Sequence, residues 1–450
     1  MKPIRTLKIS ISGVRGVIGD SLSPTLLTRF AESFGTYLNS GKIVVGRDTR
    51  TSGEMVKHAV FAGLLATGCP VVDLDICPVP TIQLMVRKLG ARGGIAITAS
   101  HNPVEWNALK LIRSDGCFLN SYQAEELLSI YHQGDYRKAR NHEIKAVKKN
   151  SQGIPSHLEQ ILKHYGPVLW KGRRLKVAID CCNGAGSLMT PELLQALGCD
   201  VVSINTTPDG IFPHPPEPVP QNLTDLCQLV KESGADVGFA QDADADRLAI
   251  VSEKGTPIGE DNTLALAVKF LLRQEQGTVV TNLSTTQAID DIAQVFNCRV
   301  IRTRIGEVNV TETMKKEKAL IGGEGNGGVI FPRINFARDS MVGITLVLHY
   351  MALTASPLST LVEELPRYYF VKHTLPCPSF RVRSFLNSLK EIYFREKLDL
   401  TDGLKILRPD SWAHIRSSNT EPIMRIVVEA RNEETAQAWA REIIAMMHDE

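Results

Sequence analysis

One pattern occurs three times along the chain and constrains its fold more than any other feature. Each copy predicts the end of a helix, then a Gly or Asn residue, then Cys, and then a strand. The copies lie at residues 64–76, 193–205 and 292–304. Gly68 and Gly198 suit the left-handed residue that closes a helix, and Asn297 is the usual second choice there. Because the copies are unevenly spaced, they predict three related domains with different insertions and argue against a solenoid.

Each repeated unit also has an apolar strand before its helix and another after the repeated segment. The earlier strands are predicted at 42–48, 174–180 and 277–283, and the later ones at 93–100, 235–242 and 319–323. Nearly continuous apolar runs are typical of parallel strands that are buried on both faces. Strands that alternate with helices predict right-handed crossovers and open sheets covered on both sides.

The chain after about residue 366 has a different pattern. It predicts a helix at 381–397, strands near 404–407 and 423–430, and a closing helix from about 433. The predicted fold class is therefore α/β with four domains, of which three are related mixed α/β domains and the fourth is a smaller α+β C-terminal domain. We place these domains at residues 1–150, 151–253, 254–365 and 366–450.

Three connecting segments lack these patterns. The proline-rich segment 208–221 predicts a long loop within the second domain. The basic run 137–149 is expected to be a solvated connector between the first and second domains, in preference to a phosphate or nucleic-acid patch. Three prolines (Pro366, Pro376 and Pro378) predict an interruption of regular structure in 364–380, where we expect a hinge.

Composition and cysteine content exclude several classes of protein. Of the 450 residues 43% are hydrophobic, which excludes a largely disordered chain, and a formal net charge of +2 predicts neither nucleic acid nor a membrane as partner. Nine cysteines without a CxxC pair favour a reducing compartment. The N-terminal apolar run is too short for a signal peptide, and segment 340–362 predicts a buried helix instead of a membrane span. We expect a cytoplasmic protein, and the sequence leaves its oligomeric state open.

Polar loops follow the last predicted strand of each repeat. They are TASHNP (98–103), DADADR (242–247) and GEGNGG (323–328), and the terminal domain adds RSSNTEP (416–422). Ligands bind beyond the carboxyl ends of the strands in open parallel sheets. The four loops are therefore expected to face one another across a single central cleft.

The acidic loop predicts a metal site. Asp242, Asp244 and Asp246 alternate with Ala, so extended backbone would place the three carboxylates on one side. Carboxylate oxygens are ligands that suit Mg²⁺. Three carboxylates that follow a buried strand would repel one another strongly if no cation neutralised them. An EF-hand is excluded because Arg247 occupies the position where its turn needs Gly. The alternative is an exposed acidic strand end without metal.

Two other loops allow both a structural and a functional interpretation. Ser100 can be an ordinary turn or cap serine, but a serine that faces a magnesium site also suggests a phosphoryl carrier. The absence of a G-x-S-x-G elbow gives no support to a hydrolase triad. The RSSNTEP loop can be a plain turn or a phosphate cradle in which Arg416 and Arg425 supply positive charge.

Together the loops resemble the motifs of the α-D-phosphohexomutases, the family of phosphoglucomutase, phosphomannomutase and phosphoglucosamine mutase. TASHNP resembles the phosphoserine loop, DADADR the metal loop, GEGNGG the sugar-recognition loop and RSSNTEP the phosphate-binding loop. The segments ISGVRG (11–16) and VGRDTR (45–50) also fit, and the order matches along essentially the whole chain. The resemblance implies four domains around a central cleft and a small sugar phosphate as the partner.

The resemblance also assigns roles to individual residues. It implies that Ser100 is a phosphoserine, activated by a hexose 1,6-bisphosphate, and that Ser100 and the three aspartates hold Mg²⁺. The residues expected to surround the transfer are Arg15, His101, Lys110 and Arg247. The residues expected to bind the sugar and its other phosphate are Glu324, Asn326, Arg416, Ser418, Asn419, Thr420 and Arg425.

The implied reaction is the interconversion of hexose 1-phosphate and hexose 6-phosphate through a bisphosphorylated sugar. A metal-dependent sugar phosphatase that uses the same Ser100 is the rival enzyme class. A sugar-phosphate sensor that kept only the fold would predict damage to Ser100, the aspartates or Lys110, and all of them are intact.

The sequence departs from the commonest family pattern at the sugar loop. That loop often ends in G-E-x-S-G-H, whereas Asn326 stands here for Ser and Gly328 for His, so Gly328 is expected to leave space where many relatives carry an imidazole. Ala108 and Asn419 each replace a frequent Gly. The loop looks most like archaeal-type sequences, which favours glucosamine phosphate as substrate, with mannose and glucose phosphates as alternatives.

Overall fold

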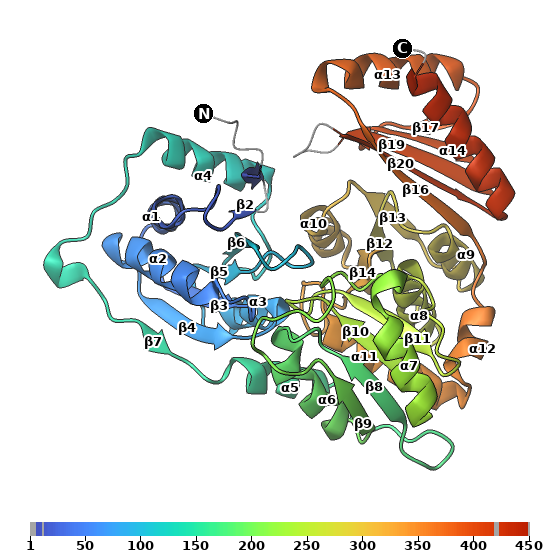
Figure 1. Cartoon of the computed structure of the whole chain (residues 1–450), viewed down its shortest axis with the longest axis horizontal. Coiled ribbons are helices and arrows are strands. Elements are labelled where there is room, and N and C mark those ends of the chain that lie inside the picture. The colour runs from blue at the N-terminus through green and yellow to red at the C-terminus, as the bar shows by residue number, and fades with distance from the viewer. Residues whose placement is uncertain (1–5, 11–12, 418–422, 449–450) are drawn as a thin grey trace.

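The computed structural model describes residues 6–10, 13–417 and 423–448, and these residues build four β-sheets that follow one another along the chain. The domains are arranged in an arc, with the first and the fourth domains at its two ends (Figure 1). Each sheet belongs to one domain, in agreement with the predicted fold class. The domain boundaries placed at residues 150, 253 and 365 stay a prediction.

The first domain holds a seven-stranded sheet in the order β1-β2-β6-β5-β3-β4-β7. Its strands are β1 (Lys8–Ser10), β2 (Gly13–Val17), β3 (Ile43–Arg47), β4 (Val71–Ile76), β5 (Gly93–Ile97), β6 (Trp106–Arg113) and β7 (Lys148–Lys149). Its helices are α1 (Pro24–Tyr37), α2 (Gly53–Ala66), α3 (Val79–Lys88) and α4 (Ser121–Gln133), with a short 3-10 turn at Asn141–Glu143 in the exposed basic connector. Buried apolar clusters cover both faces of this sheet.

The second and third domains each hold a four-stranded sheet. The second comprises α5 (Gly153–Leu162), β8 (Lys176–Asp180), 3-10 turns at Ala185–Leu188 and Pro220–Asn222, α6 (Thr190–Ala196), β9 (Asp200–Ile204), α7 (Thr224–Ser233), β10 (Val237–Gln241) and β11 (Leu248–Ser252). The third comprises α8 (Glu260–Leu272), β12 (Val279–Asn282), α9 (Ala288–Val295), β13 (Val300–Thr303), α10 (Glu307–Glu317), β14 (Ile321–Glu324), β15 (Gly328–Ile330), α11 (Ser340–Thr354) and α12 (Leu358–Glu363). One continuous apolar core joins the two domains.

The three domains share one unit, as the repeated pattern predicts. Its strand orders are β4-β3-β5-β6, β9-β8-β10-β11 and β13-β12-β14-β15. Gly68 and Gly198 close their helices at φ 83° and Asn297 at φ 53°, which is the left-handed conformation expected of them. In each unit the first three strands are parallel, and the fourth, which the sequence did not predict, is antiparallel. Each polar loop therefore connects the two strands of a hairpin.

The fourth domain is an antiparallel sheet in the order β16-β20-β19-β18-β17 with two helices. Its elements are β16 (Tyr369–Pro376), α13 (Ser379–Ile392), β17 (Lys397–Asp399), β18 (Leu404–Arg408), β19 (Ser411–Ser417), β20 (Ile423–Ala430) and α14 (Glu433–His448). The sequence predicted both helices, β18 and β20, but not the other three strands. Strand β16 lies in the middle of segment 364–380 and ends at Pro376, at the edge of the sheet, whereas Pro366 and Pro378 lie in irregular backbone on either side of it. A hinge in this segment stays a prediction.

Segment 340–362 forms a buried helix and its exit, as predicted, since most residues of α11 are inaccessible. None of the helices within the described ranges is long and apolar enough to cross a membrane.

Candidate active site

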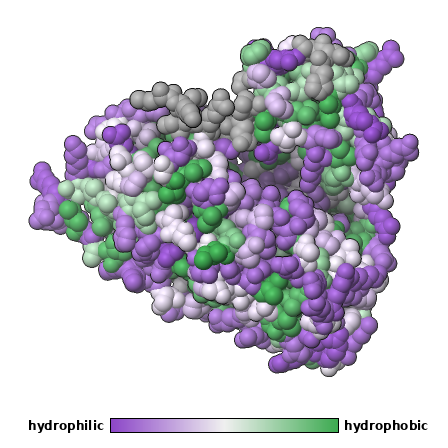
Figure 2. All heavy atoms as spheres, in the orientation of Figure 1, coloured by the Kyte–Doolittle hydropathy of each residue, from purple (hydrophilic) through white to green (hydrophobic). Residues whose placement is uncertain are grey.

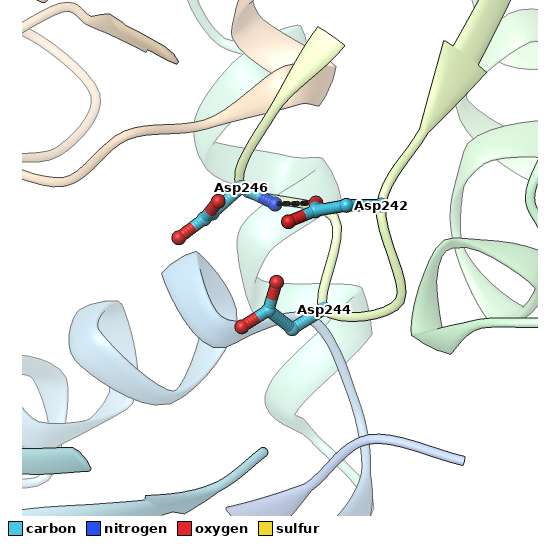
Figure 3. Close-up of side chains that lie close together, drawn as sticks. All are labelled: Asp242, Asp244 and Asp246. Atoms are coloured by element: carbon cyan, nitrogen blue, oxygen red, sulfur yellow. Dashed lines mark hydrogen bonds between the residues drawn. The ribbon is translucent and has the colours of Figure 1, made fainter. Parts of the chain in front are cut away.

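The acidic loop joins β10 to β11 and is a turn, so the prediction of an extended backbone was wrong. Ala245 adopts φ 56°, which reverses the chain between Asp244 and Asp246. The three carboxylates nevertheless converge, with ligand oxygens within 4.8 Å of one another, and all three residues are buried. Figure 3 shows the side chains pointing toward a common centre, with the backbone N–H of Asp246 donating to Asp242 Oδ1 at 3.0 Å.

The charges of this cluster are only partly balanced. Burial and the neighbouring carboxylates of Asp244 and Asp246 raise the pKa of Asp242 well above its usual value. Burial also acts to raise the pKa of Asp246, but Arg338 and Lys110 outweigh it, and the pKa is lowered. Asp244 Oδ1 and Asp246 Oδ1 are buried without a hydrogen-bond partner. Two orphaned carboxylate oxygens beside a third carboxylate fit a divalent cation with oxygen ligands, such as Mg²⁺.

Ser100 belongs to the first domain, and its side chain contacts the carboxylate cluster of the second domain. Its Oγ donates to Asp242 Oδ2 at 2.7 Å, and only 3% of the residue is exposed. The residue adopts φ 52°, which is uncommon for a non-glycine residue and is frequent at functional sites. The Nδ1 atom of His101 is 3.3 Å from the same Oγ. This arrangement contrasts with an ordinary turn serine, which would face solvent or a neighbouring backbone amide.

Arg50, in the VGRDTR segment, fixes the loop that carries Ser100. Its guanidinium donates to the backbone carbonyls of Ser100 at 2.7 Å, Asn102 at 2.6 Å and Pro103 at 2.6 Å. The side chain is fully buried and pairs with Asp48 at 3.0 Å. The sequence marked the segment but gave Arg50 no role, because contacts to carbonyls leave no trace in the pattern of side chains.

Basic side chains surround the serine and the carboxylates. Lys110, on β6, pairs with Asp244 at 2.7 Å and Asp246 at 3.5 Å. Burial opposes its charge, yet the two aspartates outweigh burial and raise the pKa of Lys110. Arg15, on β2, donates to Asn102 Oδ1 at 2.7 Å, and thus contacts the serine loop from the other side.

The proline-rich loop of the second domain adds an acidic residue to this group. Glu217 accepts from Arg247 at 3.4 Å and lies 4.0 Å from Nε2 of His101. Burial, together with the charges of Arg247 and Arg15, lowers the pKa of His101 to about 2, so its imidazole is neutral. Sequence analysis missed Glu217, because a single acidic residue among prolines carries no motif.

Glu324 ends β14 and belongs to the third domain. Its Oε1 accepts from Asn282 Nδ2 at 2.8 Å and from the backbone N–H of Gly306 at 3.0 Å. Its Oε2 accepts from Arg338 at 3.0 Å. The carboxylate is thus held in one orientation at the rim of a cavity of about 290 Å³, which Asn326 also lines.

That cavity continues into a second one of about 570 Å³ next to the serine loop. Glu260, Asn326 and Arg425 line both, so the two form one cleft. Arg15, His101, Lys110 and Arg247 lie along the first-domain end, and Arg416 and Arg425 along the fourth-domain end. Figure 2 shows the surface hollowed between these domains, with mostly hydrophilic residues around the hollow. Ser418, Asn419 and Thr420 lie outside the described residues.

Models of known protein families match nearly the whole chain. Four models of phosphoglucomutase/phosphomannomutase match in order: alpha/beta/alpha domain I at residues 7–138, domain II at 155–255, domain III at 259–369 and the C-terminal domain at 382–446. The chain belongs to this family. Its members are phosphohexomutases, a class of isomerases.

Individual relatives of the phosphoglucomutase/phosphomannomutase family support this assignment. The chain is 39% identical to "Phosphoglucomutase/phosphomannomutase" of Thermococcus kodakarensis, over 95% of each chain. It is 36% identical to "Probable phosphoglucosamine mutase" of Methanopyrus kandleri, over 96% of each chain. A crystal structure of a phosphoglucomutase/phosphomannomutase family protein from Burkholderia thailandensis aligns with a TM-score of 0.86 at 25% identity, covering 98% of this chain and 97% of that one.

The space beside Gly328, where the common family pattern has a histidine, is not empty. The prediction that Gly328 leaves space for an absent imidazole was therefore wrong. A Cβ atom at position 328 would lie 2.3 Å from Cδ and 3.0 Å from Cγ of Arg338, so the Arg338 side chain already fills that space.

Proposed function

We propose that this protein is a phosphohexomutase that interconverts hexose 1-phosphate and hexose 6-phosphate through phosphoserine 100 and a sugar bisphosphate. The observation that carries this proposal is the position of Ser100. Its hydroxyl contacts the unbalanced carboxylate cluster at one end of a cleft whose other end presents Arg416 and Arg425. A mutase needs both a transfer site and a separate site for the phosphate that is not transferred.

The residues of the cleft divide the work of the reaction. The bond between Ser100 Oγ and phosphorus breaks as the free sugar hydroxyl bonds to phosphorus, and the hydroxyl proton leaves to a neutral basic group beside it. His101, whose imidazole is neutral, lines that part of the cleft and can accept the proton, whereas Lys110 is already charged and offsets negative charge there. Glu324 binds sugar hydroxyls, and Arg416 and Arg425 hold the second phosphate. Asp242, Asp244, Asp246 and Ser100 would hold Mg²⁺, and a cation bound there would stabilise negative charge on the transferred group.

We propose glucosamine phosphate as the preferred substrate. This choice is supported by the similarity to the Methanopyrus kandleri relative, which is named a probable phosphoglucosamine mutase. The Thermococcus kodakarensis relative, named a phosphoglucomutase/phosphomannomutase, favours glucose and mannose phosphates instead. Glu324 would accept hydrogen bonds from hydroxyls that these sugars share, so this carboxylate does not by itself select among them. A site that hydrogen-bonds a substrate group rejects analogues that lack it, so selectivity at C2 is measurable.

The test is incubation of the metal-loaded enzyme with each hexose 6-phosphate and a trace of glucose 1,6-bisphosphate, followed by phosphorus NMR. Appearance of the 1-phosphate supports a mutase, whereas release of inorganic phosphate alone would show the metal-dependent phosphatase. A kcat/KM ratio above about a hundredfold for mannose or glucose phosphate over glucosamine phosphate, about 2.7 kcal/mol, would overturn the choice of sugar and leave the mutase intact.

A further inference from the structure

Arg338 joins two loops of the active site that come from different domains. Its guanidinium donates to Asp246 at 2.6 Å in the metal loop and to Glu324 at 3.0 Å in the sugar loop. A third carboxylate, Glu307 at the start of α10, lies 3.1 Å from Nε and also accepts from the backbone N–H of Arg338 at 3.4 Å. The side chain is nine-tenths buried.

The space that Arg338 occupies exists because residue 328 is glycine. With any side chain at position 328, the first carbon would collide with the stem of Arg338. Relatives with the common sugar loop carry a histidine there. Arg338 and Gly328 therefore form a steric exchange, in which the stem of Arg338, from the segment before α11, occupies the space that a side chain at position 328 on β15 would need.

The exchange has chemical consequences. An arginine is always charged and presents a planar fork that can bond two carboxylates in fixed directions, whereas a histidine titrates and a lysine is a single point charge. Because Arg338 takes Glu324 Oε2, the orientation in which Glu324 meets the cleft depends on Arg338. Because it takes Asp246 Oδ2, the unpartnered Oδ1 is the oxygen left for the cation.

We propose that Arg338 is a positioning residue that sets Glu324 and Asp246 relative to each other, in the space that Gly328 leaves open. This inference rests on the proposed function only for its kinetic consequence. The steric exchange and the effect on ligand binding are independent of it.

The first experiment tests the exchange by melting temperature, in a double-mutant cycle. Gly328→Ala in the otherwise unchanged chain forces the overlap with Arg338 and lowers the melting temperature by about 4 °C or more. The same substitution in an Arg338→Ala background changes it by less than about 1 °C, because the colliding atoms are gone. If Gly328→Ala lowered the melting temperature equally in both backgrounds, the proposed exchange between Arg338 and Gly328 would be overturned.

The second experiment uses Arg338→Lys, which keeps the positive charge and the stem among three carboxylates and should fold. Its KM and its dissociation constant for glucosamine 6-phosphate, measured by calorimetry, rise about tenfold or more, and kcat falls by a similar factor. A purely structural role would lower only the fraction of active protein, with KM and the dissociation constant unchanged, and that result would overturn the proposal.

Arg87→Lys is the matched control. Arg87, on α3, donates to Asn335 Oδ1 at 2.9 Å and to the carbonyl of Ile334 at 3.3 Å, in the segment that leads to Arg338. Among the described residues it forms no hydrogen bond or ion pair with a carboxylate of the site, so its substitution should leave KM and kcat unchanged. If the unsubstituted enzyme isomerises none of the hexose phosphates, the proposed function fails, while the melting and binding measurements still decide the role of Arg338.

Discussion

The hydroxyl of Ser100 lies 2.7 Å from Oδ2 of Asp242, a residue 142 positions away on a different domain. The proposed phosphoryl carrier and the carboxylate cluster are therefore assembled only when the first two domains pack together. The loop that bears Ser100 is held from its own domain by Arg50, and Asp246 of the carboxylate cluster is held from the third domain by Arg338. Substitutions that slightly shift the packing of these domains should therefore lower the rate of catalysis without unfolding the protein.

Replacing Arg50 by Lys should impair catalysis through the position of Ser100. A lysine cannot donate to three carbonyls in one plane, so the loop shifts, and a displacement of about 1 Å can cost about a hundredfold in rate. We expect kcat to fall between about tenfold and a hundredfold. Arg47→Lys serves as the control because the ion-pair partners of Arg47, Glu54 and Asp75, are half exposed and lie outside the loop that bears Ser100. Unchanged kcat in Arg50→Lys would contradict the positioning role of Arg50.

Replacing Asp242 by Asn should stabilise the metal-free protein and remove its response to Mg²⁺. One of three mutually repelling buried carboxylates is lost, which is worth on the order of 2 kcal/mol of unfolding free energy. Saturating Mg²⁺ should raise the melting temperature of the unsubstituted protein but not of the variant. Asp225→Asn, an exposed substitution in the same domain, should behave like the unsubstituted protein. A variant that melts lower in EDTA would refute the account of the cluster.

The sequence predicted the elements that local patterns determine. The repeated unit follows from Gly68, Gly198 and apolar strands, and the convergence of polar loops follows from the common edge of parallel strands. The turn at Ala245 could not be predicted, because it places a non-glycine residue at positive φ and depends on the packing around it.

Contacts across long separations escaped prediction for a similar reason. Arg338 meets Asp246 across 92 residues, and no spacing in the chain points to that pair. The edge strand β16 was missed because charged and proline residues interrupt its apolar pattern, and its pairing with β20 decides its structure. Contacts such as those of Arg50 with backbone carbonyls and of Arg338 with Asp246 are visible only in the fold.

The fourth domain should lose stability as the pH falls below 6.5. His414 donates from Nε2 to the carbonyl of Asp402 and accepts at Nδ1 from Ser284, and burial lowers its pKa to about 4. The unfolded chain, with the ordinary pKa of 6.5, then binds a proton that the folded domain does not, so stability decreases as pH falls from 6.5 toward 4.

The expected loss from this histidine is about 2 kcal/mol between pH 7 and pH 5. Urea unfolding of the unsubstituted protein and of His414→Gln at both pH values isolates this contribution from that of other titrating groups. The pH dependence of the variant should be shallower by that amount. Parallel pH profiles would show that His414 is not the group responsible.

Binding of a sugar bisphosphate should close the cleft. Arg416 and Arg425 lie on the fourth domain and Ser100 on the first, so closure brings the two phosphate sites together and excludes water. The movement must accommodate the contacts of Glu429 with Thr286 and Gln287 between the third and fourth domains. Small-angle scattering with and without glucose 1,6-bisphosphate should show a smaller radius of gyration in the complex. Identical profiles would indicate a rigid cleft.

Intact-protein mass spectrometry determines whether Ser100 carries the phosphoryl group. After incubation with glucose 1,6-bisphosphate and Mg²⁺, the unsubstituted protein should gain the mass of one phosphoryl group, and peptide analysis should place it on Ser100. Ser100→Ala should show neither the added mass nor turnover, while it still melts as a folded protein. Isomerisation of hexose phosphates at the normal rate by Ser100→Ala would contradict the account.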